Sequence, residues 1–148
     1  TKVMEPVSMK LYSLESEAAR KQEDEARPGP PYELAARKLN DGLNLGLDDA
    51  KLKRLGMAFH YGLAISWAPL YEGLRRRTRM APVTAGITTG AAMSVIADEM
   101  LTPRLGFSAP NRAYPLVTHL RGFLAHLAFG LAVAGVTEAA WALLRRRP

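Results

Sequence analysis

Apolar residues fill three long segments of the chain, whereas most of its first third is polar. The apolar segments are residues 55–74, 82–101 and 119–144. Segment 82–101 is about long enough to cross a bilayer as a helix and carries no charge before Asp98. Pro82 fits a first helical turn, and Pro103 cannot continue the helix. The pattern therefore predicts three membrane-crossing helices, with 82–101 in the middle of the bundle.

The N-terminal segment, residues 1–12, is mostly apolar and repeats apolar residues at helical spacing. We interpret it as the end of a membrane helix whose first half is missing, and a short amphipathic helix is the alternative. The predicted fold class is thus an all-α integral membrane helical bundle. It has three complete transmembrane helices and a partial N-terminal one.

The polar segment, residues 13–54, is predicted to form short helices outside the membrane. Residues 13–27 place opposite charges four apart, which supports a solvated helix, and residues 28–31 end it with three prolines and a glycine. Asp48 or Asp49 can cap the next helix, which becomes apolar from Leu55 onwards and should kink at Pro69.

Charge distribution gives the bundle an orientation. The formal net charge is +6, and two arginine clusters directly follow apolar segments. These clusters contain Arg75, Arg76, Arg77, Arg79, Arg145, Arg146 and Arg147. Because basic residues accumulate on the cytoplasmic side of membrane proteins, both clusters and the C-terminus are predicted to be cytoplasmic, and the polar segment extracytoplasmic. No aromatic residues interleave with the arginines, so nucleic-acid binding is not predicted.

Small residues recur every four positions and give two of the predicted helices a narrow face. The candidate helix-packing residues are Gly86, Gly90, Ser94, Gly122, Gly130 and Ala134. In lipid, a strip of small residues lets a neighbouring backbone approach closely. We therefore expect these strips to face one another inside the bundle, or to face the helices of a partner.

Ionisable residues lie on the same faces as the small ones. If the helices alternate in direction, His60, Asp98 and His126 come to a similar depth near the extracytoplasmic side. Two imidazoles and a carboxylate suit a proton relay or a divalent metal, but no tight ligand motif is present, and we favour hydrogen bonding between helices. Glu72 and Glu138 should pair with the cytoplasmic arginines.

Three stretches resemble the YagU-like inner-membrane proteins of bacteria. They are HYG at 60–62, ADEMLTPRLGF at 97–107 and HLRGFLAHLAFGLAVAG at 119–135, and the resemblance covers roughly residues 55–144. It implies about four membrane helices, a location in the bacterial inner membrane and a link to acid tolerance. The family supplies no accepted catalytic residues to carry over.

No common catalytic or phosphate-binding motif occurs, and the chain has no cysteine. We therefore predict a non-enzymatic membrane protein, structural or accessory, that packs against a larger membrane complex or against itself. The expected partners are the lipid bilayer and other membrane subunits, and no cofactor or metal is predicted. The alternative functions are a small transporter or proton-handling protein that uses His60, Asp98 and His126, and a metal-binding membrane enzyme.

Overall fold

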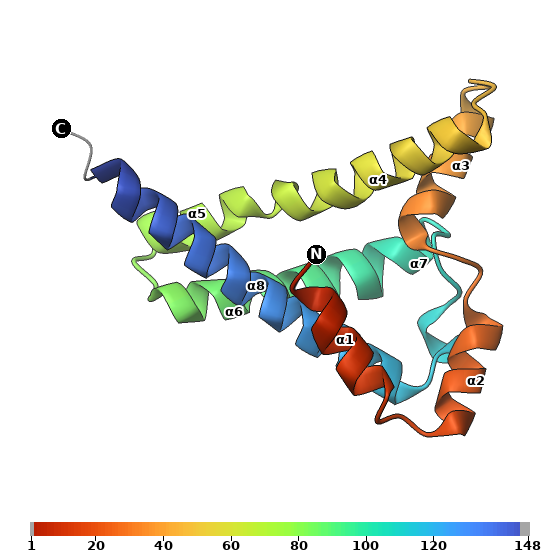
Figure 1. The fold of residues 1–148 in the computed structure, drawn as a ribbon, viewed down its shortest axis with the longest axis horizontal. Coiled ribbons are helices and arrows are strands. Elements are labelled where there is room, and N and C mark those ends of the chain that lie inside the picture. Colours follow the sequence, from red (N-terminus) through yellow and green to blue (C-terminus); the bar gives the residue numbers. More distant parts are fainter. Residues whose placement is uncertain (1, 146–148) are drawn as a thin grey trace.

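The computed structural model describes residues 2–145, and all their regular structure is helical (Figure 1). The elements are α1 (Met4–Tyr12), α2 (Glu17–Ala26), α3 (Pro31–Gly42), α4 (Asp49–Ser66), α5 (Ala68–Arg76), α6 (Pro82–Met93), the π-helix η1 (Ser94–Leu101), α7 (Thr102–Arg104), the 3-10 helix η2 (Asn111–Ala113) and α8 (Leu116–Arg145). The predicted all-α class is therefore confirmed for these residues.

The prediction of three complete transmembrane helices is wrong. Among residues 2–145, one helix, α8, is long and apolar enough to cross a membrane. Segment 55–74 is divided between α4 and α5, because Pro69 has no N–H to continue the helix. Segment 82–101 changes from an α-helix to a π-helix at Ser94. The N-terminal segment forms only the nine-residue α1, which is too short to span a bilayer.

Local sequence signals explain where several helices begin. Ser16 caps α2 by accepting a hydrogen bond from the backbone N–H of Ala19 at 3.2 Å. Asp48 caps α4 in the same way, through the N–H of Lys51 at 2.9 Å. Helices α3 and α6 each place a proline in the first turn, where its missing N–H costs no hydrogen bond.

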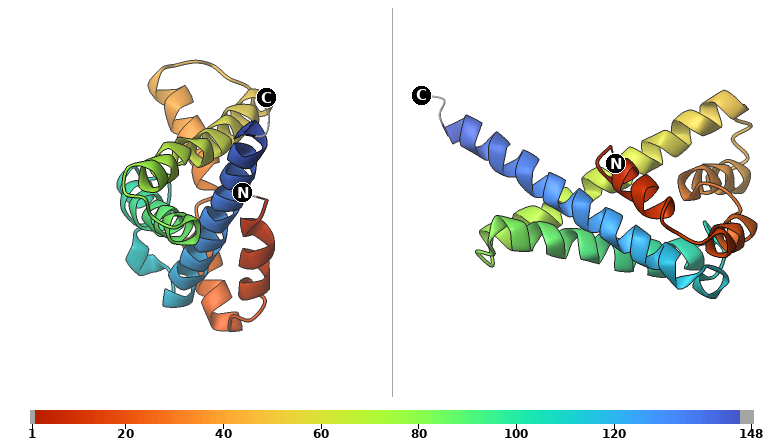
Figure 2. Two further views of the ribbon diagram at one scale, coloured as in Figure 1. Left: turned by 90° about the vertical axis from the view of Figure 1, so that its left-hand side faces the viewer. Right: turned by 60° about the horizontal axis from the view of Figure 1, so that its bottom comes forward.

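The centre of the molecule is an antiparallel pair formed by α6 with η1 and by α8 (Figure 1). Helix α1 lies along α8, and α2 packs near the beginning of α8 (Figure 2). Helices α3 and α4 form a hairpin, and α4 runs away from the central pair beyond α5. This arrangement leaves long apolar surfaces of α4, η1 and α8 exposed.

Glycines allow α6 and α8 to approach closely. A Cβ atom added to Gly130 would overlap the carbonyl oxygen of Gly86, and one added to Gly90 would overlap that of His126. A Cβ on Gly86 would lie 2.7 Å from the carbonyl oxygen of Gly130. The two backbones are therefore in contact, and larger residues at these positions would push the helices apart.

Two small clusters of buried apolar residues lie along this pair. One contains Tyr71, Ala85 and Ala134, and the other contains Met93, Ala97 and Phe129. Met4 of α1 and Ala64 of α4 pack against the second cluster, together with Trp67. The core therefore joins α1, α4, η1 and α8 around the position where the candidate site forms.

A buried ion network attaches the N-terminal helices to α8. The guanidinium of Arg121 donates to both carboxylate oxygens of Glu23 at 2.6 Å and to Glu15 at 2.5 Å. Thr118 and Arg27 also bind Glu23, whose side chain is 1% exposed. Each charge is matched within the network, as burial requires. Burial alone would raise the pKa of Glu23, but these hydrogen bonds and the two arginines outweigh it and lower that pKa.

The Glu23→Gln variant should be less stable and less sensitive to acid than the natural chain. Because the folded state lowers the pKa of Glu23 below its ordinary value of 4.5, the unfolded state binds more protons around that pH. The contribution of Glu23 is complete above this value and is lost as pH falls through the folded pKa. We expect a loss of about 2 kcal/mol at neutral pH, since a charged hydrogen bond disappears.

Urea titrations in detergent micelles, at neutral pH and near pH 3, would measure the free energy of unfolding. The matched control is Glu25→Gln, because Glu25 is exposed on the same helix and its ion pair is a loose one with the exposed Lys21, at 3.9 Å. Equal acid sensitivity in the natural chain and in Glu23→Gln would exclude the assigned role of Glu23.

Candidate functional site

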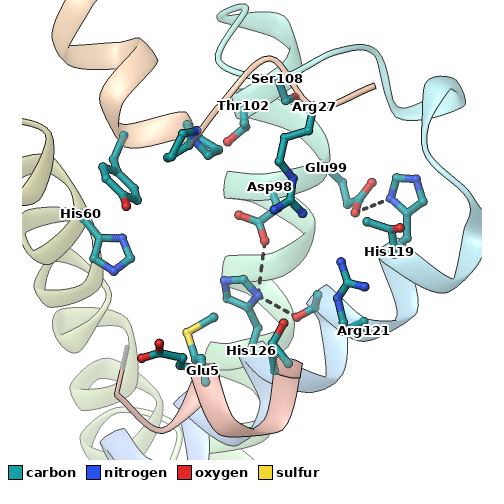
Figure 3. A pocket seen from close by; sticks show the side chains of 18 of the residues that line it. Glu5, Arg27, His60, Asp98, Glu99, Thr102, Ser108, His119, Arg121 and His126 are labelled. Carbon is teal, nitrogen blue, oxygen red and sulfur yellow. Dashed lines mark hydrogen bonds and ion pairs between the residues drawn. The ribbon is translucent and has the colours of Figure 1, made fainter. Parts of the chain in front are cut away.

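A cavity of about 680 Å³ lies between α1, α3, α4, η1 and α8. All three histidines of the chain line it, and so do two acidic residues of η1, Asp98 and Glu99 (Figure 3). These polar groups come from helices far apart in the sequence. The cavity is therefore the place where the chain concentrates its ionisable side chains.

Asp98 and His126 form the central pair of this site. Nδ1 of His126 lies 2.8 Å from the carbonyl oxygen of Gly122 and 3.3 Å from a carboxylate oxygen of Asp98 (Figure 3). The side chain of His126 is 8% exposed, whereas that of Asp98 is 42% exposed because it faces the cavity. The imidazole is thus fixed in place, and the carboxylate keeps one side open to a ligand.

A second acid–imidazole pair lies beside the first. Nδ1 of His119 is 2.8 Å from a carboxylate oxygen of Glu99, and its Nε2 is 3.1 Å from the carbonyl oxygen of Asn111. The amide of Asn111 in turn donates to the backbone carbonyl of Glu99 at 2.9 Å. These bonds fasten the loop before α8 to η1.

Sequence reasoning did not assign this second pair. The signal that could have found it is the spacing of His119 and His126, which are seven residues apart and therefore share one face of α8. Their acidic partners, Asp98 and Glu99, are adjacent in sequence, and both lie in the π-helix η1. Such π-helical segments are frequent at functional sites.

His60 lines the cavity but does not join the Asp98–His126 pair. Its ring lies 4.9 Å from the ring of Tyr32 and 5.5 Å from that of Tyr61, measured between centroids. Burial lowers the pKa of His60, which favours the neutral imidazole at physiological pH. The predicted cluster of His60, Asp98 and His126 therefore shares one cavity, in which only the last two are in contact.

A metal ion is not favoured by this arrangement. Among residues 2–145, no group of three or more histidine, aspartate or glutamate side chains is placed to hold one. Zinc and related ions need three or four such ligands converging on a point. The hypothesis of a metal-binding enzyme thus gains no support from the geometry, and the proton-handling alternative stays a prediction.

The small residues on the predicted packing strips have different environments. Gly86, Gly90 and Gly130 lie at the contact between α6 and α8, and Ser94 and Ala134 are buried beside it. A Cβ added to Gly122 would meet no neighbour within 4 Å, and the carbonyl of this residue instead accepts the bond from His126. The strips are thus largely used inside the chain.

Basic residues gather at the opposite end of the molecule. Glu138 accepts hydrogen bonds from Arg75 at 2.5 Å and from Tyr71 at 3.1 Å. Glu72 pairs with Arg76 at 3.1 Å, and the guanidinium of Arg76 lies 4.9 Å from the ring centre of Trp141. The two glutamates therefore pair with arginines. Arg77, Arg79 and Arg145 complete this end within the described residues, and Arg146 and Arg147 lie outside them.

Comparisons with known proteins do not identify this chain. No protein-family model, curated protein or solved structure matches it. The resemblance to YagU-like proteins therefore stays a prediction, and the site has to be interpreted from its own residues.

Proposed function

We propose that this chain is a non-enzymatic accessory protein that α8 anchors in a membrane, where it packs against a larger complex. The observation that carries this proposal is the exposure of α8. Only 17% of its most apolar 18-residue segment is buried inside the protein, whereas the core helix of a water-soluble protein is mostly buried. An apolar surface of this length needs lipid or a partner to cover it.

The charges on α8 support the same interpretation. Besides His126, residues 122–144 contain one ionisable residue, Glu138, and Arg75 neutralises it. This stretch rises about 34 Å as a helix, compared with about 30 Å for the hydrocarbon core of a bilayer. Arg121 and Arg145 mark its two ends, and Arg121 is already paired with Glu15 and Glu23. No unpaired charge therefore has to enter the apolar phase.

Helix α6 and the π-helix η1, which pack against α8, also expose an apolar surface. Large apolar side chains on the outer side of α6 and η1 are exposed, and they are Val83, Ile87, Val95, Ile96, Met100 and Leu101. Because α6 lies in backbone contact with α8, these side chains extend the exposed apolar surface beside α8. The basic end faces the cytoplasm in this proposal, because arginines are retained there. The membrane in this proposal is a bacterial inner membrane. Helices α2 and α3 then lie at its opposite face, at the end of α8 that lines the cavity.

The accessory role is supported by an exposed apolar face of α4. Helix α4 exposes Leu63 and Ile65 and packs chiefly against α3, so one face of it has no apolar neighbour in the described structure. Tyr71, Glu138 and the small-residue strips serve internal contacts and are not free for catalysis. The proposed role is therefore to occupy a position in an assembly.

Native mass spectrometry of protein extracted gently from its own membranes tests this role. We expect a mass larger than that of one 16.2 kDa chain, with additional subunits that stay bound in mild detergent. The Leu63→Arg variant should reduce this association, whereas Leu43→Arg, on the exposed end of α3, should not. A bare monomer under mild extraction would contradict the accessory role.

A further inference from the structure

The cavity beside His126 offers hydrogen-bond acceptors to a ligand. Figure 3 shows Asp98 and His126 meeting in the cavity, His60 on the opposite wall and Glu5 of α1 at its lower edge. The volume of about 680 Å³ is that of a small-molecule site. The proposed membrane role does not require a ligand in this cavity. The polar groups that line it indicate which kind of ligand it can bind.

The bonds of His126 fix which ring nitrogen is free. The carbonyl oxygen of Gly122 can only accept a hydrogen bond, so Nδ1 of His126, at 2.8 Å, must carry a proton and donate it. In the neutral ring, Nε2 then bears a lone pair. Nε2 makes no hydrogen bond to residues 2–145, although the side chain is more than nine-tenths buried. Figure 3 shows this nitrogen directed across the cavity, towards the wall that carries His60.

Other groups that line the cavity also favour a cation. The carboxylates of Asp98 and Glu5 accept hydrogen bonds, and the rings of Tyr32 and Tyr61 line the wall near His60. Aromatic faces attract positive charge.

The basic residues of the cavity are mostly engaged elsewhere. Arg121 binds Glu15 and Glu23, and Arg27 also binds Glu23. His119 is held by Glu99. Lys2 is exposed at the edge, and within the described part of the chain it forms no ion pair with these acceptors. Asp98 and Nε2 of His126 therefore remain available to a ligand.

We propose that this cavity binds a primary ammonium group, whose N–H bonds are accepted by the carboxylate of Asp98 and by Nε2 of His126. The rings of Tyr32, His60 and Tyr61 border the rest of the ligand. A primary ammonium has three hydrogen-bond donors and one positive charge. Unlike a metal ion, it does not need three or four side chains that converge on one point. It can belong to a free amine or to the headgroup of an aminophospholipid.

Isothermal titration of n-propylammonium into the full chain in phosphatidylcholine nanodiscs tests the site. The Asp98→Asn variant should bind about tenfold more weakly, because a charged hydrogen bond is lost. His126→Asn keeps a donor for Gly122 but lacks Nε2, and a weakening of about fivefold is expected. Glu72→Gln removes an equal charge at the opposite end and should leave the affinity unchanged. No binding to the natural chain, or equal binding by Asp98→Asn, would overturn the proposal.

Two further measurements avoid dependence on the folding of the variants. In the natural chain, the ¹⁵N resonance of Nε2 of His126 should shift on saturation with propylammonium, and that of His119 should not. Tetramethylammonium, which has no N–H, should bind more weakly than propylammonium. Equal binding of the two cations, or an unchanged His126 resonance, would exclude the proposed hydrogen bonds.

The source of the ammonium is decided by the lipid. If the headgroup of phosphatidylethanolamine occupies the site, nanodiscs that contain this lipid should weaken the apparent affinity for propylammonium by competition. If a free amine is the occupant, the affinity should not depend on this lipid. Both results support an ammonium site, and they separate its two sources.

Discussion

The Gly130→Ala variant should lose about 3 kcal/mol of stability, although alanine is a better helix former than glycine. The added Cβ would overlap the backbone carbonyl of Gly86, which cannot move without displacing α6. Overpacking of a close contact costs about 1–3 kcal/mol, and here the obstacle is backbone, so we expect the upper end of that range. The helices must separate, and this also weakens the contact of Gly90 with His126.

The matched control for this prediction is Gly135→Ala on the same helix. A Cβ at Gly135 meets nothing within 4 Å, so this variant should gain up to about 1 kcal/mol from helix propensity. Denaturation of both variants in one detergent, followed by circular dichroism, measures the difference. If Gly130→Ala is as stable as Gly135→Ala, the two backbones are not in contact.

The Leu131→Arg variant should lose about 3 kcal/mol of membrane insertion free energy. Leu131 lies at the middle of α8, and its side chain is exposed. An arginine at the centre of a membrane helix costs about 2.5–3.5 kcal/mol on insertion scales, and the favourable contribution of leucine is lost as well. A loss of this size lowers the insertion equilibrium about 100-fold.

Insertion of α8 into microsomal membranes, scored by glycosylation of flanking acceptor sites, measures this effect. Leu43→Arg provides the control, because Leu43 is also exposed but follows α3, far from α8 in the sequence. Similar insertion of α8 with arginine and with leucine at position 131 would show that this helix does not enter the bilayer.

Several features of the fold follow directly from the sequence. The helical class follows from apolar residues repeated at helical spacing, and the break between α4 and α5 follows from Pro69. Asp48, one of the two aspartates predicted as the cap, caps α4. These features depend on neighbouring residues alone, which is why sequence patterns report them.

The number of membrane spans could not be obtained in the same way. Hydropathy sums composition over a window, and it does not register that the helix is interrupted at Trp67 or widens at Ser94. The first residues of α4 are charged, so the apolar part of this helix is shorter than the helix itself. Helix α8, in contrast, continues without a break from Leu116 to Arg145.

The candidate site was partly predictable. Helical spacing and the alternation of chain direction place Asp98 near His126, and the two groups are 3.3 Å apart. The same logic does not predict that the ring of His60 packs against that of Tyr32, because α3 approaches α4 through a loop whose path the sequence does not define. Glu99, which pairs with His119, lies in the π-helix η1, and no residue pattern in that segment indicates a π-helix.

Extraction of the protein from its native membranes tests the central claim, membrane anchoring by α8, most directly. Membranes would be washed with high salt and alkaline carbonate, and the pellet would then be treated with detergent. The account predicts that the chain stays in the pellet through both washes and is released only by detergent. Release by salt or carbonate would contradict it, because a helix that spans a bilayer is not removed by breaking ionic contacts.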